Sequence, residues 1–287
     1  MTGRPVARRT RTPITTRRTR PIRRASAGLS TARAGAALAM LVSAAAVYGV
    51  GASPAFDYVR MEVNELHLTD AGAVEAALAD VRGENLFRLP TGPLQAELER
   101  LPTVAHARVD VRLPGTLAVT LDERVPVLIW QVAEQRYLAD ADGSLFALLA
   151  GAPPSEAAGL PVVDDRRAES AGLAVGSHLD PVDLDAATRL ASLVPADVGS
   201  SAVSLGLAVT DEHGFVVATR PAGWSAIFGF YTPSLRTTEL VPGQVRLLRS
   251  LLIGREGLVE RVILASETDG TYVPRPTPSA SAKAKAP

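Results

Sequence analysis

The stretch HARVDVRLPGTLAVTLD (His106–Asp122) decides the fold of the region around it. Apolar and polar side chains alternate on both sides of the dipeptide Pro114–Gly115. Two such period-two runs joined by a turn dipeptide predict an antiparallel hairpin that packs one face on a core and turns the other to water. The apolar face is expected to contain Ala107, Val109, Val111, Leu113, Leu117, Val119 and Leu121.

Two short amphipathic helices are predicted just before this hairpin. The first follows Asp70, a residue type that caps helix N-termini, and carries an apolar stripe of Val74, Ala77, Leu78 and Val81. The second follows Thr91, its expected cap, and stops at Pro102. With a short strand predicted over residues 58–64, the order becomes strand–helix–helix–strand–strand. That order makes a compact α+β unit with both helices on one sheet face.

The chain after residue 126 is predicted to form a second, β-rich region that extends to residue 273. Its expected elements are two pairs of strands, two helices and a last strand, at residues 127–139, 203–220, 186–194, 240–253 and 258–264. From Pro274 onward the sequence is rich in Pro, Ser, Ala and Lys. This composition buries no core, so we expect a disordered tail over residues 274–287.

The N-terminal segment is strongly basic and ends in an apolar run. The first 56 residues contain ten arginines and no acid, whereas the rest of the chain carries 20 basic and 30 acidic groups. The 23 residues from Ala34 to Phe56 are uncharged. A helix of that length spans about 34 Å, enough for a hydrocarbon core of roughly 30 Å. We therefore expect a disordered cytoplasmic tail over residues 1–33, a transmembrane helix over 34–56 and an exported remainder, because positive charge stays in the cytoplasm.

Arginines flank the predicted anchor on its cytoplasmic side and are expected to contact anionic membrane lipids. The flanking residues are Arg23, Arg24 and Arg33. Two alternatives exist for the apolar run, a cleaved signal peptide and a buried core helix. Nucleic-acid binding is the alternative for the arginine run, but topology and lipid contact are the simpler interpretation, and we predict no nucleic-acid partner.

Four motifs follow one another along the predicted α+β unit: Asn85-Leu86-Phe87, Leu101-Pro102, Leu113-Pro114-Gly115-Thr116-Leu117 and Glu123-Arg124-Val125-Pro126-Val127. Trp130 and the segment Asp140–Phe146 come next. In their order and spacing, after a basic tail and one apolar run, they resemble the polypeptide-transport-associated (POTRA) domain of the FtsQ/DivIB family of bacterial cell division proteins.

The resemblance implies a single-pass type II membrane protein at the division septum, with a POTRA domain over residues 57–126 and a β-domain over 127–273. It also implies a non-enzymatic divisome scaffold bound to membrane proteins of the FtsB and FtsL type. In the family, the partner adds a strand near the C-terminal edge of the β-domain. The nearest strand here comprises Val259, Glu260, Arg261, Val262, Ile263 and Leu264. The alternative is a POTRA-containing protein-export or envelope-assembly factor, which would carry tandem POTRA repeats or a long barrel region.

The sequence shows no catalytic constellation. Its only lysines, Lys283 and Lys285, exclude a serine–lysine nucleophile and a phosphate-binding loop, and cysteine is absent. The four histidines are scattered without metal spacing. The acidic run from Asp180 to Asp185 favours a helix N-terminus over a calcium loop. Glu123 and Arg124 are interpreted as a structural ion pair. We therefore predict no enzyme activity, no metal, no cofactor and no small-molecule substrate.

Overall fold

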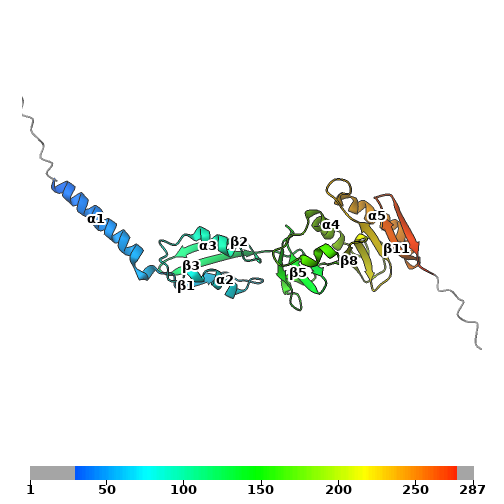
Figure 1. Cartoon of the computed structure of the whole chain (residues 1–287), viewed down its shortest axis with the longest axis horizontal. Helices are drawn as coiled ribbons and strands as arrows, with labels where there is room; N and C mark the ends of the chain where they lie inside the picture. Colours follow the sequence, from blue (N-terminus) through cyan, green and yellow to red (C-terminus); the bar gives the residue numbers. More distant parts are fainter. Residues whose placement is uncertain (1–29, 277–287) are drawn as a thin grey trace, which may run out of the picture. The chain divides into compact units, whose positions relative to one another are not determined.

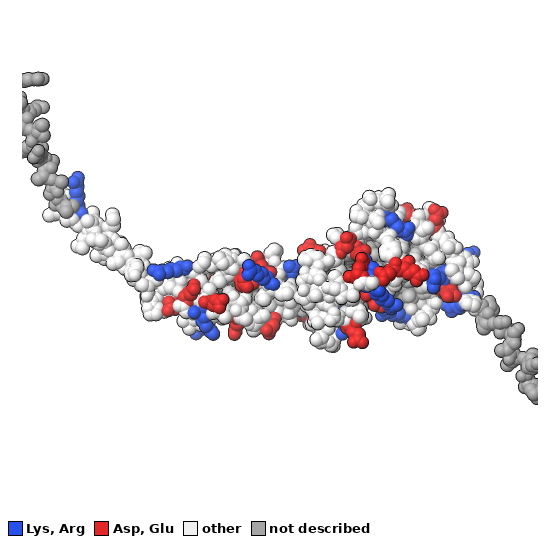
Figure 2. All heavy atoms as spheres, in the orientation of Figure 1, with Lys and Arg blue, Asp and Glu red and all other residues white. Residues whose placement is uncertain are grey.

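The computed structural model describes residues 30–276, and its first element is the apolar helix α1 (Thr31–Ala52). α1 is long and apolar enough to cross a membrane, and Figure 2 shows it uncharged along its length apart from one basic side chain at its start. The helix lies a few residues upstream of the predicted range, because Pro54 opens a separate 3-10 turn, η1 (Pro54–Phe56), which the Ser53 hydroxyl caps. Arg33 lies in the first turn of α1, whereas Arg23, Arg24 and the rest of the expected tail up to residue 29 lie outside the described residues.

A small α+β unit follows in the chain (Figure 1). Its sheet has the order β1–β3–β2, with β1 parallel and β2 antiparallel to the central β3. Its elements are β1 (Arg60–Val63), α2 (Ala71–Ala77), η2 (Ala79–Val81), α3 (Thr91–Leu98), β2 (Val104–Arg112) and β3 (Thr116–Glu123). The predicted strand–helix–helix–strand–strand order is therefore confirmed.

Helices α2 and α3 bury the apolar face of this sheet. Val74 and Leu98 of the helices and Leu117 of β3 are fully buried in one cluster. The predicted cap of α2 is confirmed, since an Asp70 carboxylate oxygen accepts the Ala73 N–H at 3.0 Å. The predicted cap of α3 is wrong. Thr91 is already helical, and the preceding proline occupies the cap position without a side-chain hydrogen bond.

The apolar face of the β2–β3 hairpin is fully buried only over part of its length. Val109 and Val119 face the core as predicted, with 3% and 2% of their surface exposed. Val111 and Leu113, at the turn end of the hairpin, are 36% and 52% exposed instead. The predicted apolar face therefore continues beyond the core that covers it.

The second region is built on a sheet that holds nine strands within residues 30–276, in the order β12–β11–β10–β9–β8–β7–β4–β5–β6. Parallel pairs join β4 to β7, β7 to β8 and β10 to β11, and the other neighbours are antiparallel. The strands are β4 (Leu128–Val132), β5 (Gln135–Ala139), β6 (Leu145–Leu148), β7 (Val162–Asp165), β8 (Ser204–Thr210), β9 (Gly214–Arg220), β10 (Ser225–Gly229), β11 (Val259–Leu264) and β12 (Gly270–Pro274).

Two helices, α4 (Pro181–Ala191) and α5 (Val241–Leu252), cover one face of this sheet (Figure 1). Leu190 of α4 and Leu248 of α5 pack in one buried cluster with Trp130, Val217 and Phe228 from the strands. Because side chains alternate along a strand, the residues between these point to the other face of the sheet. That other face is open along β7 to β11.

The predicted helices, the hairpin β8–β9 and the last predicted strand, β11, are all present. Strands β6, β7, β10 and β12 were not predicted. β10 and β12 are each five residues long, and β12 ends at Pro274, the first residue of the segment that composition assigned to a tail. The chain stays ordered further than expected, because the Arg275 N–H donates to the Leu258 carbonyl at 2.7 Å. The remainder of the predicted tail, residues 277–287, lies outside the described residues.

Candidate functional site

The strand predicted to bind the partner is present but does not lie at a sheet edge. β11 pairs with β10 on one side and with β12 on the other. Strict alternation would place Val259, Arg261 and Ile263 on one face and Glu260 and Val262 on the other, but an irregularity in the pairing falls between Val259 and Arg261. Val259, Val262 and Leu264 are buried beneath the helices, whereas Glu260, Arg261 and Ile263 are exposed. The six predicted residues thus form the second strand of the sheet.

The open edge belongs to β12. All five of its residues are exposed, and no strand among residues 30–276 pairs with its outer side. The opposite edge, β6, is partly closed, because the Leu145 N–H donates to the Ser177 carbonyl (2.9 Å) and the Gly176 N–H donates to the Leu145 carbonyl (2.7 Å). Of the two edges of this sheet, β12 is therefore the one that presents a row of open backbone groups.

The hydrogen-bond pattern shows which groups of β12 point outward. The Ala265 N–H donates to the Asp269 carbonyl at 2.8 Å, so these two residues form a hydrogen-bonded pair at the start of the hairpin. Such pairs alternate along antiparallel strands. By the observed register, Thr271 and Val273 direct their backbone groups toward β11, and Tyr272 directs its N–H and C=O to the open side. Tyr272 is the central backbone position available to an added strand.

A groove of about 300 Å³ lies on the open sheet face over β8, β9 and β10. Its floor is made by small and apolar side chains of β8, β9 and β10, and three arginines, Arg166, Arg220 and Arg261, line it. Arg166 forms an ion pair with Asp164 (2.6 Å), whereas Arg220 and Arg261 have no ion-pair partner within 4.0 Å among residues 30–276. The groove therefore offers two arginines without an ion-pair partner, and one of them, Arg261, lies on β11, the strand next to β12.

One carboxylate anchors the start of β11. Glu256, in the turn η6 (Glu256–Leu258), accepts the Trp224 indole N–H (3.0 Å), the Ser201 N–H (3.0 Å) and the hydroxyls of Ser200 and Ser201. Burial alone would raise the pKa of Glu256, but these hydrogen bonds to the charged form lower it to about 2. Because Trp224 immediately precedes β10, this cluster ties the first residues of the parallel strands β10 and β11 together.

A second polar cluster holds the other end of the same two strands. Arg236 donates to the carbonyls of Phe228 (2.6 Å) and Leu264 (2.8 Å), which are at the ends of β10 and β11, and also to Ala265. Gln244, fully buried on α5, donates to the same two strand carbonyls at 3.3 Å each. Carbonyls that the sheet leaves unpaired are thereby satisfied, as burial requires.

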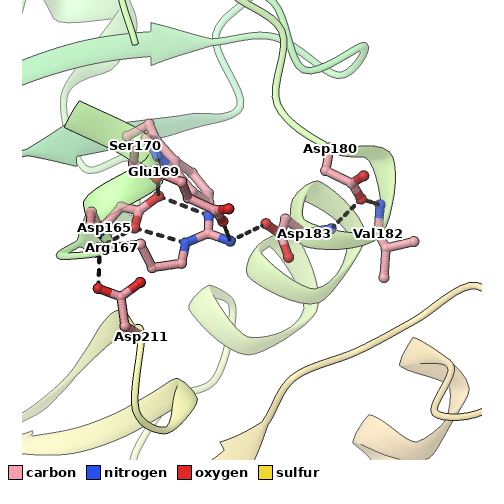
Figure 3. A network of polar contacts seen from close by, with 10 residues as sticks. Asp165, Arg167, Glu169, Ser170, Asp180, Val182, Asp183 and Asp211 are labelled. Atoms are coloured by element: carbon pink, nitrogen blue, oxygen red, sulfur yellow. Dashed lines mark hydrogen bonds and ion pairs between the residues drawn. The ribbon is translucent and has the colours of Figure 1, made fainter. Parts of the chain in front are cut away.

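The most buried set of ionisable groups in the described chain is structural in character (Figure 3). The Asp165 carboxylate accepts the Trp130 indole N–H (3.1 Å), the Ser170 hydroxyl (2.6 Å) and the Arg167 guanidinium (2.9 Å). Arg167 also donates to Asp183 on α4 at 2.6 Å. This network ties β7 to α4 through the short turn η4 (Ala168–Gly172).

The protonation of this network follows from its contacts. Burial alone would raise the pKa of Asp165, but the hydrogen bonds from Arg167 and Ser170 hold it below its usual value. Burial raises the pKa of Asp183 despite its bond to Arg167, and the two carboxylates together raise the pKa of Arg167. Both Asp165 oxygens are occupied by donors inside the protein, so the Ser170 hydroxyl has no free base beside it. The set does not form a nucleophile–base pair.

Two further predictions concern the acidic run that begins at Asp180 and the pair Glu123 and Arg124. Asp180 caps α4, accepting the Val182 N–H at 2.8 Å, which confirms the helix-start interpretation of the acidic run. Glu123 and Arg124 do not pair with each other. Glu123 accepts backbone N–H groups of residues 67–69, and Arg124 forms an ion pair with Asp140 at 2.6 Å. Successive side chains on a strand point to opposite faces, which separates the two.

Comparison with known proteins identifies one domain of the chain and several proteins that are similar to it. Residues 59–124 match the family model described as POTRA domain, FtsQ-type. The chain is 32% identical over 140 residues to the cell division protein FtsQ of Mycobacteroides abscessus, which covers 47% of this chain and 41% of that protein. It is 30% identical over 181 residues to the FtsQ of Chloroflexus aggregans, covering 62% and 64%. This chain carries a POTRA domain of the FtsQ type. The resemblance found in the motifs is thereby confirmed.

Each of these FtsQ relatives is matched over part of its length only. The FtsQ of Corynebacterium glutamicum is 31% identical over 117 residues, which covers 40% of this chain and 52% of that protein. Across the three relatives, the matched region spans about half of the relative. The FtsQ-type POTRA match ends at residue 124, so the β11–β12 edge lies outside it. The role of that edge therefore rests on its own geometry.

We predict that Arg167→Met lowers the free energy of unfolding by about 3–5 kcal/mol, because it leaves the buried Asp165 carboxylate without its cation. Arg166→Met is the matched control, since Arg166 is mostly exposed and its ion pair contributes about 1 kcal/mol or less. Chemical denaturation of the two variants measures the difference. Equal losses for the two variants would contradict the structural role assigned to Arg167.

We predict a pH-dependent stability contribution from Glu256. Its pKa in the folded chain lies below its ordinary value of 4.5, so the contribution is present above pH 4.5 and is lost as the pH falls toward about 2. The free-energy difference between the wild type and Glu256→Gln should therefore shrink over that range in denaturation experiments. Glu260→Gln, which removes an exposed carboxylate of β11, is the control. A constant difference for Glu256→Gln would refute the assignment.

Proposed function

We propose that this chain is a non-catalytic scaffold of the divisome that links septal membrane proteins of the FtsB and FtsL type during cell division. α1 serves as its single membrane anchor, with the basic N-terminus in the cytoplasm and the POTRA and β-rich regions exported. The charge asymmetry around α1 supports this orientation, because ten arginines precede the charge-free run and acidic groups predominate after it. The FtsQ-type POTRA domain and the similarity to FtsQ proteins support a role in division without catalysis.

The open edge of β12 is the observation that carries the proposed binding mode. An extended partner segment can continue the sheet by pairing with Tyr272, and alternate side chains then give specificity. The groove on the open sheet face, which reaches Arg261 on the neighbouring strand β11, adds selectivity for acidic side chains, since Arg220 and Arg261 lack ion-pair partners among the described residues. The partner site is thus proposed on β12 with Arg261 of β11 beside it, rather than on the backbone of β11.

We predict that Tyr272→Pro weakens capture of the partner about fivefold, because the change removes the outward N–H and one hydrogen bond contributes about 1 kcal/mol. Tyr272→Ala is the matched control, since it removes the side chain but keeps the backbone donor. The measurement is co-purification from membranes, with unfolding curves to show that both variants remain folded.

The same experiment separates this proposal from its alternatives. Loss of division partners with Tyr272→Pro and retention with Tyr272→Ala supports strand addition. Equal capture by the two variants would exclude it. Recovery of secretion machinery in place of division proteins would favour an export or envelope-assembly role. A fluorescent fusion provides the second readout, and the proposal expects a band at midcell in dividing cells.

A further inference from the structure

Three separate segments meet at the end of the POTRA unit where the chain leaves α1. They are residues 53–59, 83–87 and 113–115, and backbone hydrogen bonds join them. The Leu86 N–H donates to the Phe56 carbonyl (2.9 Å), and the Val59 N–H donates to the Gly115 carbonyl (3.0 Å). The Asn85 side chain also donates to the Ser53 carbonyl at 3.0 Å. The end of the domain is therefore a defined surface and not a loose linker.

This surface, which we call the proximal patch, carries exposed apolar side chains from all three segments. Val59 is 70% exposed, and Phe87 and Leu113 are each 52% exposed. The Phe87 ring stands edge-on to the ring of Phe56, with 5.0 Å between their centroids. Single exposed apolar residues are common on proteins, but several from different loops at one end mark an interaction surface.

The length of the connection limits where the patch can lie. Only Ser53, Pro54 and Ala55 separate Ala52, the last residue of α1, from Phe56. Four extended residue steps span at most about 14 Å. If α1 spans a bilayer, as proposed above, Phe56 cannot move far from the headgroup layer, which is roughly 5–8 Å thick on each side of the hydrocarbon core. The exposed apolar side chains of the patch are therefore close enough to contact the lipids.

The charged groups around the patch are compatible with a membrane surface. Arg60, Arg82 and Arg88 are exposed on the segments that form the patch or continue from it. Exposed basic groups near a membrane are attracted to anionic headgroups. The acids Asp57 and Glu84 lie among them, so the apolar side chains and not the net charge must provide most of the attraction.

We propose that the proximal patch docks into the headgroup region of the bilayer that α1 crosses, with Phe87 and Leu113 inserted among the lipids. The occupant of the patch is thus the membrane itself. This second attachment point restricts the rotation of the POTRA unit about its short linker, and with it the directions from which the rest of the exported chain approaches the membrane. The inference rests on the proposed anchor role of α1 and adds a lipid contact to the POTRA domain.

The absence of cysteine makes this proposal directly testable, because each introduced cysteine is the only one in the chain. The full chain is reconstituted in vesicles of phosphatidylethanolamine and phosphatidylglycerol. A polarity-sensitive fluorophore is attached at Phe87→Cys or at Leu113→Cys. Matched controls carry it at Val203→Cys or Leu235→Cys, which are 83% and 93% exposed in the β-rich region.

The expected result is blue-shifted emission and quenching by lipid-borne quenchers at positions 87 and 113, with neither effect at 203 and 235. Equal emission and no lipid quenching at all four positions would overturn the proposal. In a further pair of variants the fluorophore is attached at Val59→Cys. With no other change, lipid-borne quenchers should quench it. When Phe87→Ser and Leu113→Ser are added to the same labelled chain, this quenching should be lost. Circular dichroism checks that each variant is folded.

Flotation of the vesicles distinguishes failure of the anchor role of α1 from failure of the docking of the proximal patch. Protein that floats with the vesicles but shows no lipid quenching at positions 87 and 113 overturns the docking of the patch and leaves the anchor intact. Protein that fails to float overturns the anchor role of α1 and the docking together.

Discussion

A strand at the edge of a sheet leaves a row of backbone N–H and C=O groups without partners. Because β11 pairs with β12, the edge strand at the C-terminal end of the large sheet is β12. Without β12, the buried and well-anchored β11 would present the open edge. With it, the open groups move to a short strand whose five residues are all exposed. β12 ends in Pro274, which has no N–H to offer, so the open edge is only a few residues long. Edges that are short and closed by proline resist uncontrolled pairing while accepting a matched segment.

The interior of the β-rich region is organised to hold this edge in place. Glu256 fixes the starts of β10 and β11, and Arg236 with Gln244 fixes their ends. The network around Arg167 does the same for β7 and α4. In all three clusters the charged or amide group is bonded to strand or turn atoms inside the protein. These hydrogen bonds make the sheet rigid, and among the described residues the buried Arg236 Nε is the one side-chain atom that they leave without a partner.

The sequence predicted the POTRA unit well because its signals are local. The alternation from His106 to Asp122 and the helical spacing after Asp70 each determine one element, and the turn residues set their order. The cap at Thr91 was wrong because Pro90 already takes the extended conformation that precedes the helix.

The edge was harder to predict because it depends on pairing between distant segments. β10 and β11 are parallel neighbours separated by a loop and a helix, and no periodicity within either strand reveals that contact. β12 had one local signal, the run Thr271-Tyr272-Val273 of β-forming residues, which the following proline-rich sequence obscured. The burial of Val259 and the exposure of Glu260 depend on an irregularity of pairing that is not visible in the sequence. The proximal patch was equally hidden, since Val59, Phe87 and Leu113 come together only in the folded domain.

The central claim is that a partner strand pairs with the outer side of β12. Amide hydrogen exchange, resolved to single residues in the presence and absence of the exported part of an FtsB-type partner, tests it most directly. A partner strand paired with β12 is expected to slow exchange of the Tyr272 amide strongly. The Val273 amide, which already faces β11, should change little. Slowed exchange confined to β6 or to the POTRA unit, with Tyr272 unchanged, would contradict the account.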